Sequence, residues 1–345
     1  MIVNISAMHY DVSEGYGLTA VKFIEHINLA GDPNFSTVPL SREQLGWPTR
    51  LLKFSQIDIT NPLLHFGQPT DHDFSAIPGR AWLFTMYETD KIPDTWPDLI
   101  NSRFERVIVP CQHNAEVFKR CGITVPIHVV PLGVEPPPLP PTRPPVRHSE
   151  PFVFLALADR LVRKGYDIAM QAFTRAFGDD ENVRLIIKSK VDQHGSELPG
   201  MFRAADLDPR ISFWRYNADD MSSVYEIADC FVFPSRGEGF GLPPREATVL
   251  GIPSIVTPWA GMADADKWAI PITDFTLMRS FAMRGEGLWA VPTVDGVAEK
   301  MRWVYDNRNE ANEIAARGAE YLTSNFTWSQ AAQKLLTLFN KYMRV

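Results

Sequence analysis

The fold of the second half of this 345-residue chain is decided by the segment FPSRGEGFGLPPREA, residues 233–247. It follows the apolar run 230–233 and leads into helical spacing, so it is predicted to join a buried strand to a helix. Its glycines can expose backbone N–H groups, and Glu246 lies near the predicted helix start, where an anion is stabilised. Glu238 and Glu246 can therefore accept hydrogen bonds from the vicinal hydroxyls of a sugar or a ribose. The plainer alternative is that Glu246 complements the helix dipole and Glu238 is a solvated loop residue.

Short apolar runs alternate with amphipathic segments of helix length on both sides of this segment, which is typical of an α/β protein. The predicted strands are nearly wholly apolar, as expected for parallel sheets covered by helices on both faces. We therefore predict two doubly wound, Rossmann-like domains facing a cleft, with ligands beyond the carboxyl ends of the strands. The predicted strands are residues 2–7, 81–86, 107–110, 127–130, 152–158, 183–188, 211–214, 230–234 and 254–257. The predicted helices are residues 17–29, 114–121, 166–177, 221–228 and 244–250.

Proline content marks the boundary between the two predicted domains. Nine of the 28 prolines lie from Pro131 to Pro151, both included. Such a stretch can neither continue a helix nor pair in the centre of a sheet, and it is typical of a semi-rigid linker. The predicted parts are a first domain over 1–135, a linker over 136–151, a second domain over 152–326 and a final helix over 327–345.

The predicted final helix has a clear start. Thr327 and Gln330 are spaced as a capping box, in which each side chain accepts a hydrogen bond from the other residue's backbone N–H group. Apolar residues follow at helical spacing toward Val345. We expect this helix to cross back to the first domain.

Charge and cysteine content argue against several classes of protein. Lys and Arg number 34 and Asp and Glu 41, a formal net charge of -7, so no overall positive field favours nucleic acid as a partner. No run of about 18 apolar residues predicts a spanning helix, so any membrane contact is expected to be peripheral. The start of the chain lacks the basic and apolar regions of a signal peptide. Three scattered cysteines are typical of a reducing compartment, and we expect a cytoplasmic protein.

The stretch 218–257, in which Glu238 and Glu246 form an E-x7-E motif, resembles the retaining glycosyltransferases of family four, which have the GT-B fold. Three further segments earlier in the chain match the family in the expected order, and they are residues 15–17, 131–134 and 159–165. The resemblance thus covers nearly the whole chain. The resemblance implies transfer of a sugar from a nucleoside-diphosphate sugar, a UDP- or GDP-sugar, to a hydroxyl acceptor. The second domain would bind this donor and the first the acceptor, with no permanently bound cofactor.

The resemblance also implies roles for residues of the second domain. Arg160 and Lys164 match the cations that hold the donor's diphosphate, where fixed positive charge stabilises the departing nucleotide. The family's usual spacing is one residue longer, so Arg163 is an alternative to Lys164. Glu246 matches the residue that binds the ribose hydroxyls. The transferred sugar is expected to contact Glu238 and the donor-binding residues that follow it, Gly239, Phe240, Gly241 and Leu242.

In the first domain the resemblance points to two segments. Gly15-Tyr16-Gly17 matches the loop before a helix whose backbone N–H groups approach the donor phosphates and the acceptor. Many relatives place a histidine just after the strand that corresponds to 81–86, but this chain has Tyr87-Glu88-Thr89-Asp90 there. Glu88 is the candidate for that position, where a carboxylate could orient the acceptor hydroxyl or stabilise oxocarbenium character. A simple loop role is the alternative.

No metal is expected. Asp71-His72-Asp73 imitates the DxD motif by which another class of glycosyltransferase holds a divalent cation, but no apolar strand leads into it. Arg160 and Lys164 already supply the positive charge that a metal would contribute. Retention in this family is generally ascribed to front-face attack, in which a departing phosphate oxygen takes the acceptor's proton. The resemblance therefore implies neither a covalent nucleophile nor a dedicated base.

Three alternatives stay open at this stage. A nucleotide-sugar epimerase or hydrolase of similar fold would convert the donor without an acceptor, although the E-x7-E context argues against it. A non-catalytic sugar-binding relative would lack the diphosphate clamp, whereas Arg160, Lys164, Glu238 and Glu246 are all present. A virus-type glycosyltransferase could act on modified DNA bases, against which the acidic net charge argues. The sequence leaves open the base, the sugar, the acceptor, the linkage and the oligomeric state.

Overall fold

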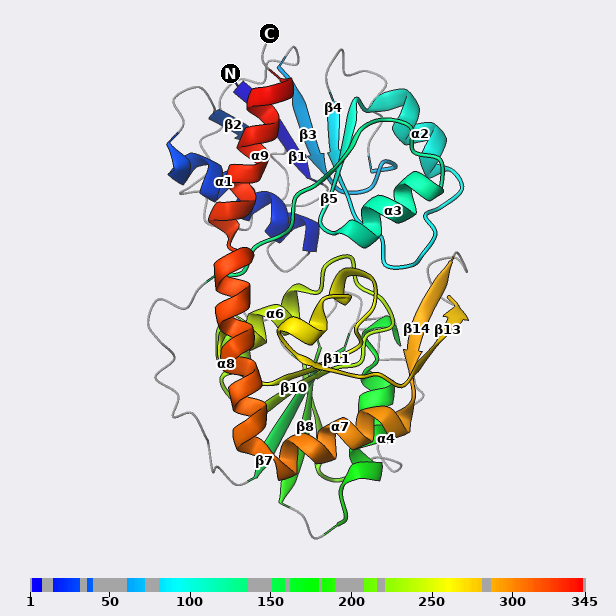
Figure 1. Ribbon diagram of the computed structural model, residues 1–345, viewed down its shortest axis with the longest axis vertical. Helices are drawn as coiled ribbons and strands as arrows, with labels where there is room; N and C mark the ends of the chain where they lie inside the picture. The colour runs from blue at the N-terminus through cyan, green and yellow to red at the C-terminus, as the bar shows by residue number, and fades with distance from the viewer. Residues whose placement is uncertain are drawn as a thin grey trace. The chain divides into compact units, whose positions relative to one another are not determined.

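Two compact units make up the chain, shown in Figure 1 as a computed structural model. Unit 1 is Met1–Gly133 with Asn325–Val345, and unit 2 is Val134–Ser324. Within the described ranges, no helix combines the length and the apolar character needed to cross a membrane. The described residues are 2–7, 15–31, 36–39, 61–71, 81–135, 151–158, 162–179, 182–189, 208–215, 221–280 and 287–343.

Unit 1 is built on a six-stranded parallel sheet in the order β2-β1-β3-β4-β5-β6. Its central strands are buried on both faces, which explains their continuous apolar sequences. In the register of the sheet, Ser6 lies opposite His65 and Phe66 opposite Phe84. The strands are β1 Ile2–Ala7, β2 Ser36–Pro39, β3 Leu63–Phe66, β4 Ala81–Phe84, β5 Arg106–Val109 and β6 Ile127–Val129. The helices are α1 Gly15–Ala30, α2 Trp96–Arg103, α3 Gln112–Arg120 and α9 Trp328–Tyr342.

The C-terminal helix α9 belongs to unit 1, so the prediction that it crosses back is confirmed. It lies beside α1 in Figure 1. The Trp328 ring of α9 packs edge-on against Phe23 of α1, with 5.7 Å between the ring centroids. The predicted capping box is present: Gln330 N donates to Thr327 Oγ1 at 3.2 Å, and Thr327 N donates to Gln330 Oε1 at 2.9 Å. A short polar signal therefore sets the start of the helix, and the buried aromatic contact attaches it to unit 1.

Unit 2 holds a second parallel sheet in the order β12-β11-β10-β7-β8-β9. Counted along the chain this is the doubly wound order 3-2-1-4-5-6, with the reversal between β7 and β10. The strands are β7 Phe152–Leu157, β8 Val183–Ser189, β9 Ile211–Arg215, β10 Cys230–Phe233, β11 Ser254–Val256 and β12 Ile270–Pro271. The helices are α4 Tyr166–Ala176, α5 Ser222–Tyr225, α6 Leu242–Val249, α7 Val294–Asp306 and α8 Arg308–Asn325, with short 3₁₀ turns at Val162–Lys164, Ala260–Met262 and Ala265–Lys267.

The core of unit 2 lies between the sheet and the helices α4 and α7. Phe154 on β7 contacts Phe173 and Phe177 of the α4 region, with ring centroids 6.3 and 5.4 Å away. Each such buried side chain contributes roughly 1.5–3 kcal/mol to folding. This packing holds the N-terminus of α4 near the carboxyl end of β7, which positions the candidate site.

Several predicted bounds differ from the structure. The strand predicted over 81–86 ends at Phe84, which lies opposite Phe66, the last residue of its other neighbour β3. The helix predicted over 221–228 shortens to α5. The sequence pattern also missed the antiparallel ribbon of β13 Phe275–Arg279 and β14 Leu288–Pro292. The proline-rich linker predicted over 136–151 lies outside the described residues except for its last one.

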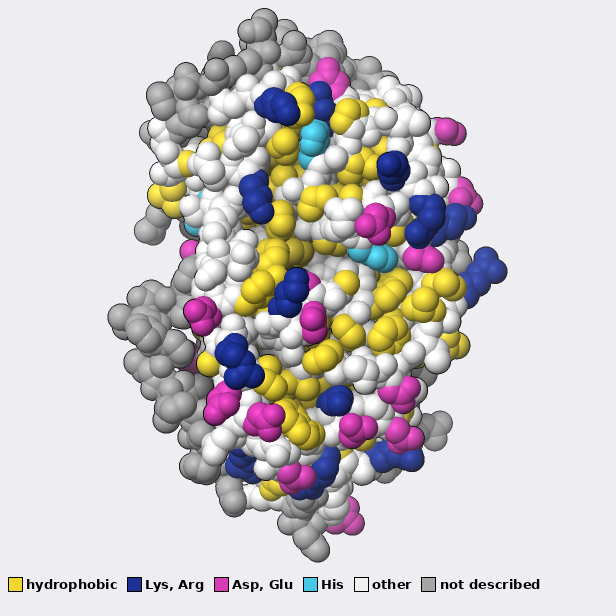
Figure 2. All heavy atoms as spheres, viewed as in Figure 1, with side chains coloured by type: hydrophobic (Ala, Val, Ile, Leu, Met, Phe, Trp, Pro, Cys, Tyr) yellow, Lys and Arg dark blue, Asp and Glu magenta, His cyan; other side chains and the backbone are white. Residues whose placement is uncertain are grey.

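Charged side chains of both signs are interspersed on the face drawn in Figure 2. Lys and Arg lie among Asp and Glu on both units, and the hydrophobic side chains in view form patches between them. A nucleic-acid surface would gather basic residues along one stripe, and on this face the described residues form no such stripe.

Candidate functional site

The two loops of unit 2 that carry the predicted donor residues leave neighbouring parallel strands. β7 pairs with β10, with Leu155 opposite Phe231, and this is where the strand order reverses. At such a reversal the following connections run to opposite faces of the sheet, and ligands bind outside the carboxyl ends of the strands. The loops meet there: the N–H of Arg236 donates to the carbonyl oxygen of Arg163 at 2.7 Å.

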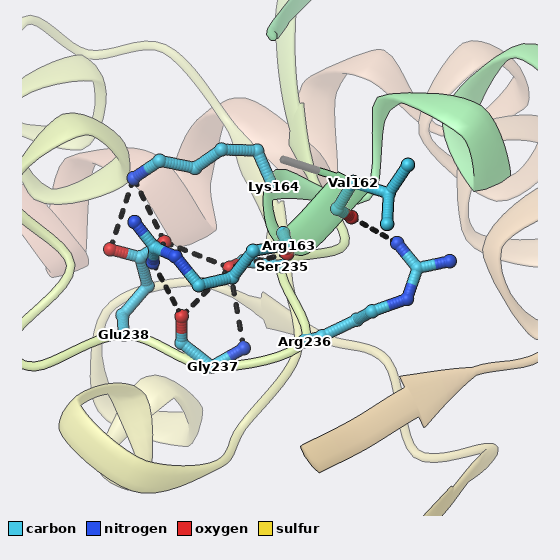
Figure 3. Close-up of polar contacts among 7 residues, drawn as sticks. All are labelled: Val162, Arg163, Lys164, Ser235, Arg236, Gly237 and Glu238. Atoms are coloured by element: carbon cyan, nitrogen blue, oxygen red, sulfur yellow. Dashed lines mark hydrogen bonds and ion pairs between the residues drawn. The ribbon is translucent and has the colours of Figure 1, made fainter. Parts of the chain in front are cut away.

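Glu238 lies at the centre of the candidate site and is buried. Its Oε1 accepts hydrogen bonds from Lys164 Nζ at 2.9 Å, Arg163 Nη1 at 2.7 Å and Ser235 Oγ at 2.8 Å, drawn in Figure 3. Lys164 Nζ also lies 3.1 Å from Oε2. Burial alone raises the pKa of Glu238, but the charges of Arg163 and Lys164 outweigh it and hold the pKa below its ordinary value. The carboxylate is therefore ionised at neutral pH.

The cluster holds two cations close together. Among the described residues, Arg163 and Lys164 both bind the carboxylate of Glu238, and their side chains are only 11% and 15% exposed. Charged N–H donors held in this way can also bind phosphate oxygens through charge-assisted hydrogen bonds. The helix α4 begins two residues beyond Lys164, at Tyr166, and adds the positive end of a helix dipole. The cluster is therefore suited to a diphosphate.

Gly165 allows the loop before α4 to lie against the loop after β10. Its φ is 74°, and a Cβ built on it would lie 2.0 Å from the carbonyl oxygen of Pro234. Any other residue would push the two loops apart and move Lys164 away from Glu238.

Arg236 ties the two loops together. Its guanidinium binds both carboxylate oxygens of Asp167, at 2.9 and 2.7 Å, and also donates to the carbonyl oxygen of Val162. This bidentate pair joins the loop after β10 to the first turn of α4. Arg236 is therefore neutralised by a carboxylate of its own, whereas Arg163 and Lys164 share the carboxylate of Glu238.

The backbone that follows Glu238 is supported by the turn at Ala260–Met262. The N–H of Gly261 donates to the carbonyl oxygen of Glu238 at 2.9 Å. A Cβ on Gly261 would lie 2.5 Å from backbone atoms of Gly239 and Phe240, so the two chain segments touch without space for a side chain. Gly241 has a φ of 80° and caps α6. The glycines of the motif thus serve close backbone approach.

Arg245 braces this loop from inside, although it is 1% exposed. It pairs with Asp264 at 2.6 Å and donates to the carbonyl oxygens of Gly261 at 3.1 Å and Phe240 at 3.3 Å. Its guanidinium also lies over the rings of Phe240 and Trp268, with centroids 4.4 and 4.5 Å away. Sequence reasoning missed this residue, although it lies inside the E-x7-E motif.

Glu246 lies in α6, is half-buried and has a partner of a different kind. The hydroxyl of Tyr225 donates to its Oε2 at 3.0 Å. Burial, reinforced by Glu246, raises the pKa of Tyr225 well above its ordinary value, so the phenol stays neutral. Glu246 is thus oriented by a neutral donor, whereas Glu238 is held by cations.

Gly15, Tyr16 and Gly17 form the first turn of α1 rather than a loop before it. First-turn N–H groups have no partner within the helix, so this position still offers donors. The Tyr16 side chain reaches the backbone of Met86, with its oxygen 3.1 Å from the Met86 N. Glu88 follows two residues later and is half-buried.

In the structure Asp71 is bound to residues close to it in the sequence. Its Oδ2 accepts from the N–H of Gln68 at 2.7 Å and lies 3.3 Å from His65 Nε2. His65 in turn bonds Ser6 through Nδ1 at 2.8 Å. In the part of the chain that is described, no three His, Cys, Asp or Glu side chains are grouped as metal ligands. Arg160, His72 and Asp73 lie outside the described residues.

The chain is similar in sequence to known proteins. The model of the "Family 4 Glycosyltransferase in conflict systems" family matches residues 112–335, well over half of the chain. The chain is 27% identical over 228 residues to mannosylfructose-phosphate synthase of Agrobacterium fabrum, covering 61% of this chain and 47% of that protein. It is 29% identical over 149 residues to the lipopolysaccharide core mannosyltransferase LpsB of Rhizobium meliloti, covering 43% and 39%. The matched regions span less than half the length of these relatives.

Solved structures share the whole fold. Sucrose-phosphate synthase from Thermosynechococcus elongatus superposes with a TM-score of 0.75 at 13% identity, covering 99% of both chains. HepE of Anabaena, crystallised with UDP and glucose, gives a TM-score of 0.69 at 13% identity, covering 99% of this chain and 100% of HepE. These likenesses establish the GT-B fold of two Rossmann-like domains. The chain therefore belongs to the family 4 glycosyltransferases of conflict systems.

Proposed function

We propose that this protein is a retaining glycosyltransferase that moves a sugar from a nucleoside-diphosphate sugar to an acceptor hydroxyl. The observation that carries the proposal is the cluster beyond the ends of β7 and β10, where two nearly buried cations, Arg163 and Lys164, are held beside Glu238. Such cations bind phosphate oxygens through strong charge-assisted hydrogen bonds, which suits a diphosphate. Unit 2 would bind the donor and unit 1 the acceptor.

The donor would be held along the two loops of unit 2. Arg160, with Lys164 or Arg163, would bind the diphosphate, and Glu246 would accept hydrogen bonds from the ribose hydroxyls. Glu238 and the backbone of Gly239–Leu242 would contact the transferred sugar. When the phosphates arrive, Lys164 and Arg163 can turn part of their hydrogen bonding from Glu238 to phosphate oxygens.

The chemistry needs charge stabilisation more than a base. The bond from the anomeric carbon to the diphosphate oxygen breaks, and a bond from the acceptor oxygen forms on the same face of the sugar. The acceptor's proton passes to the departing phosphate oxygen, so the products are the glycoside and the nucleoside diphosphate. Cations fixed near that oxygen stabilise the negative charge that develops on it, and such electrostatic stabilisation accounts for much of the rate enhancement in many enzymes.

The donors to test are UDP-sugars and GDP-sugars, in that order. UDP-sugars are the first donors to test, because HepE, with the same fold, was crystallised with UDP and glucose. GDP-sugars are the second. Glu88 is the proposed group facing the acceptor in unit 1. We propose a cytoplasmic enzyme without a permanently bound cofactor, in keeping with its scattered cysteines.

The proposed function is tested first by measuring nucleotide binding and then by detecting the glycoside product. Calorimetry against UDP, GDP and their sugars should show selective binding, and Lys164→Ala should weaken it at least tenfold, because a charge-assisted contact is lost. Lys300→Ala removes another paired lysine of unit 2, on α7, and serves as the matched control. Transfer is then followed by NMR of the anomeric proton. Unchanged affinity in Lys164→Ala, or hydrolysis equally fast with and without acceptor, would overturn the proposal.

A further inference from the structure

The segment 85–90, which follows β4, leaves the sheet, bends at residues 88–90 and stays partly buried. Thr85 N still donates to the carbonyl oxygen of Ile108 at 2.9 Å, as a strand residue would. Beyond it, burial alternates: Thr85, Tyr87 and Thr89 are buried, and the residues between them are half-buried. Buried backbone groups outside a sheet need other partners, so the partners of this segment reveal how it is held.

One phenol from α1 serves both backbone groups of Met86. The Tyr16 oxygen lies 3.1 Å from the Met86 N and 3.1 Å from the Met86 O, and 3.2 Å from Thr85 Oγ1. A hydroxyl can accept from the N–H and donate to the carbonyl at once. Burial raises the pKa of Tyr16 far above its ordinary value, so the donor is retained.

One amide from α3 does the same for the next residue. The N–H of Tyr87 donates to Asn114 Oδ1 at 2.8 Å, and Asn114 Nδ2 donates to the carbonyl oxygen of Tyr87 at 3.1 Å. Asn114 is 1% exposed. Its amide replaces the strand neighbour that residue 87 has lost.

The residues after Glu88 are held from α3 as well. The His113 ring is hydrogen-bonded to the backbone of Thr89, and Arg120 Nη2 donates to the carbonyl oxygen of Asp90 at 2.5 Å. The Tyr87 ring packs edge-on against Trp96 at 5.2 Å between centroids. Backbone groups on both sides of Glu88 are thus bound by side chains of two helices.

We propose that Tyr16 and Asn114 are positioning residues that fix Glu88 for the sugar-transfer step, an inference that rests on the proposed function. Each side chain binds both backbone groups of one residue. Removing the hydrogen bonds of either side chain therefore releases the segment without removing a large apolar side chain from the core. A misplacement of about 1 Å in a reacting group can lower a rate about a hundredfold. Tyr16 also belongs to the first turn of α1, so this contact links the two segments of unit 1 predicted to face substrate.

The experiment compares Tyr16→Phe and Asn114→Ala with Asn101→Ala. Asn101 on α2 also binds backbone groups through both ends of its amide elsewhere in unit 1, but on two different residues, Gly122 O and Thr124 N, both at 2.8 Å. All three variants should bind the nucleoside diphosphate like wild type. Tyr16→Phe and Asn114→Ala should lose about tenfold or more in kcat, while Asn101→Ala keeps it. If Tyr16→Phe and Asn114→Ala both keep the wild-type kcat, or if Asn101→Ala loses as much kcat as they do, the inference is wrong.

A double-variant cycle tests whether the effect passes through Glu88. If it does, Tyr16→Phe should cost little once Glu88→Gln is present, because both changes remove one function. Multiplicative losses contradict the inference. Hydrogen exchange supplies a readout without activity: Tyr16→Phe should speed exchange of the amides of residues 86–89 and leave the rest of unit 1 unchanged. If the wild type transfers no sugar, the proposed function is wrong. The exchange data alone then test whether Tyr16 holds residues 86–89, and unchanged exchange of these amides would show that it does not.

Discussion

The hydroxyl of Tyr225 lies 3.0 Å from Oε2 of Glu246 and donates a hydrogen bond to it from a buried ring. The phenol therefore fixes the orientation of the carboxylate that is proposed to bind the ribose. Glu246→Ala should weaken binding of nucleotide and nucleotide sugar alike, by about 1.5–3 kcal/mol for a lost ionic acceptor. Tyr225→Phe should weaken both by less, about 1 kcal/mol, since only the orientation is relaxed. Calorimetry on the two variants checks this order, and a Tyr225→Phe loss larger than that of Glu246→Ala would contradict it.

Glu238→Gln, unlike Glu246→Ala, should not weaken binding of the bare nucleotide. Without this carboxylate, Arg163 and Lys164 lose a buried counter-ion, so the free energy of unfolding should fall by about 3 kcal/mol. The nucleoside diphosphate brings negative charge to the same cations, so its affinity should be equal or higher, while sugar transfer falls sharply. Thermal melts with and without nucleotide measure both effects. A weaker affinity for the bare nucleotide would show that Glu238 binds it directly.

The depressed pKa of Glu238 predicts a pH-dependent contribution to stability. A carboxyl whose pKa is lower in the folded state stabilises the fold above its unfolded value, about 4.3, and this stabilisation is lost as the pH falls through the folded value. The difference in unfolding free energy between wild type and Glu238→Gln should therefore be full near neutral pH and shrink in acid. Urea titrations at several pH values test this. A difference that grows on acidification would reverse the assigned sign.

Gly261→Ala should displace the loop that follows Glu238. The added methyl would lie 2.5 Å from backbone atoms of Gly239 and Phe240, which cannot rotate away. We expect a stability loss of about 1–3 kcal/mol and weaker binding of the nucleotide sugar. Gly178→Ala is the control, because a Cβ there meets no atom within 4 Å. Equal effects of the two substitutions on donor affinity would mean that the close approach at Gly261 has no role in the site.

Sugar transfer should persist in excess chelator, because side-chain cations and a helix start supply the positive charge. Asp71→Asn should lower stability by about 1 kcal/mol through its turn at Gln68 and leave the response to metal unchanged. Activity assays with chelator and with added manganese test this prediction. Activity that is abolished by chelator and restored by manganese would make Asp71 and Asp73 metal ligands after all.

Local patterns were enough to predict the fold class, because each depends on residues close together in the chain. Apolar runs predicted the buried parallel strands, and the spacing of Thr327 and Gln330 predicted the start of α9. The E-x7-E motif identified the loop after β10 as the proposed donor loop. The β13–β14 ribbon was missed because β13 is largely exposed and lacks the apolar run of a buried strand.

Partners distant in the sequence were settled only by the strand order. Lys164 and Glu238 are 74 residues apart, and they meet because β7 and β10 are neighbours in the sheet. Tyr16 and Met86 are 70 residues apart and meet across unit 1, where α1 follows β1 and residue 86 follows β4, with β3 between the two strands. A sequence motif can identify a carboxylate of the candidate site. The pKa of that carboxylate and the charged residues that contact it depend on which strands are neighbours in the sheet. That adjacency arises from packing of the whole sheet, and no local pattern encodes it.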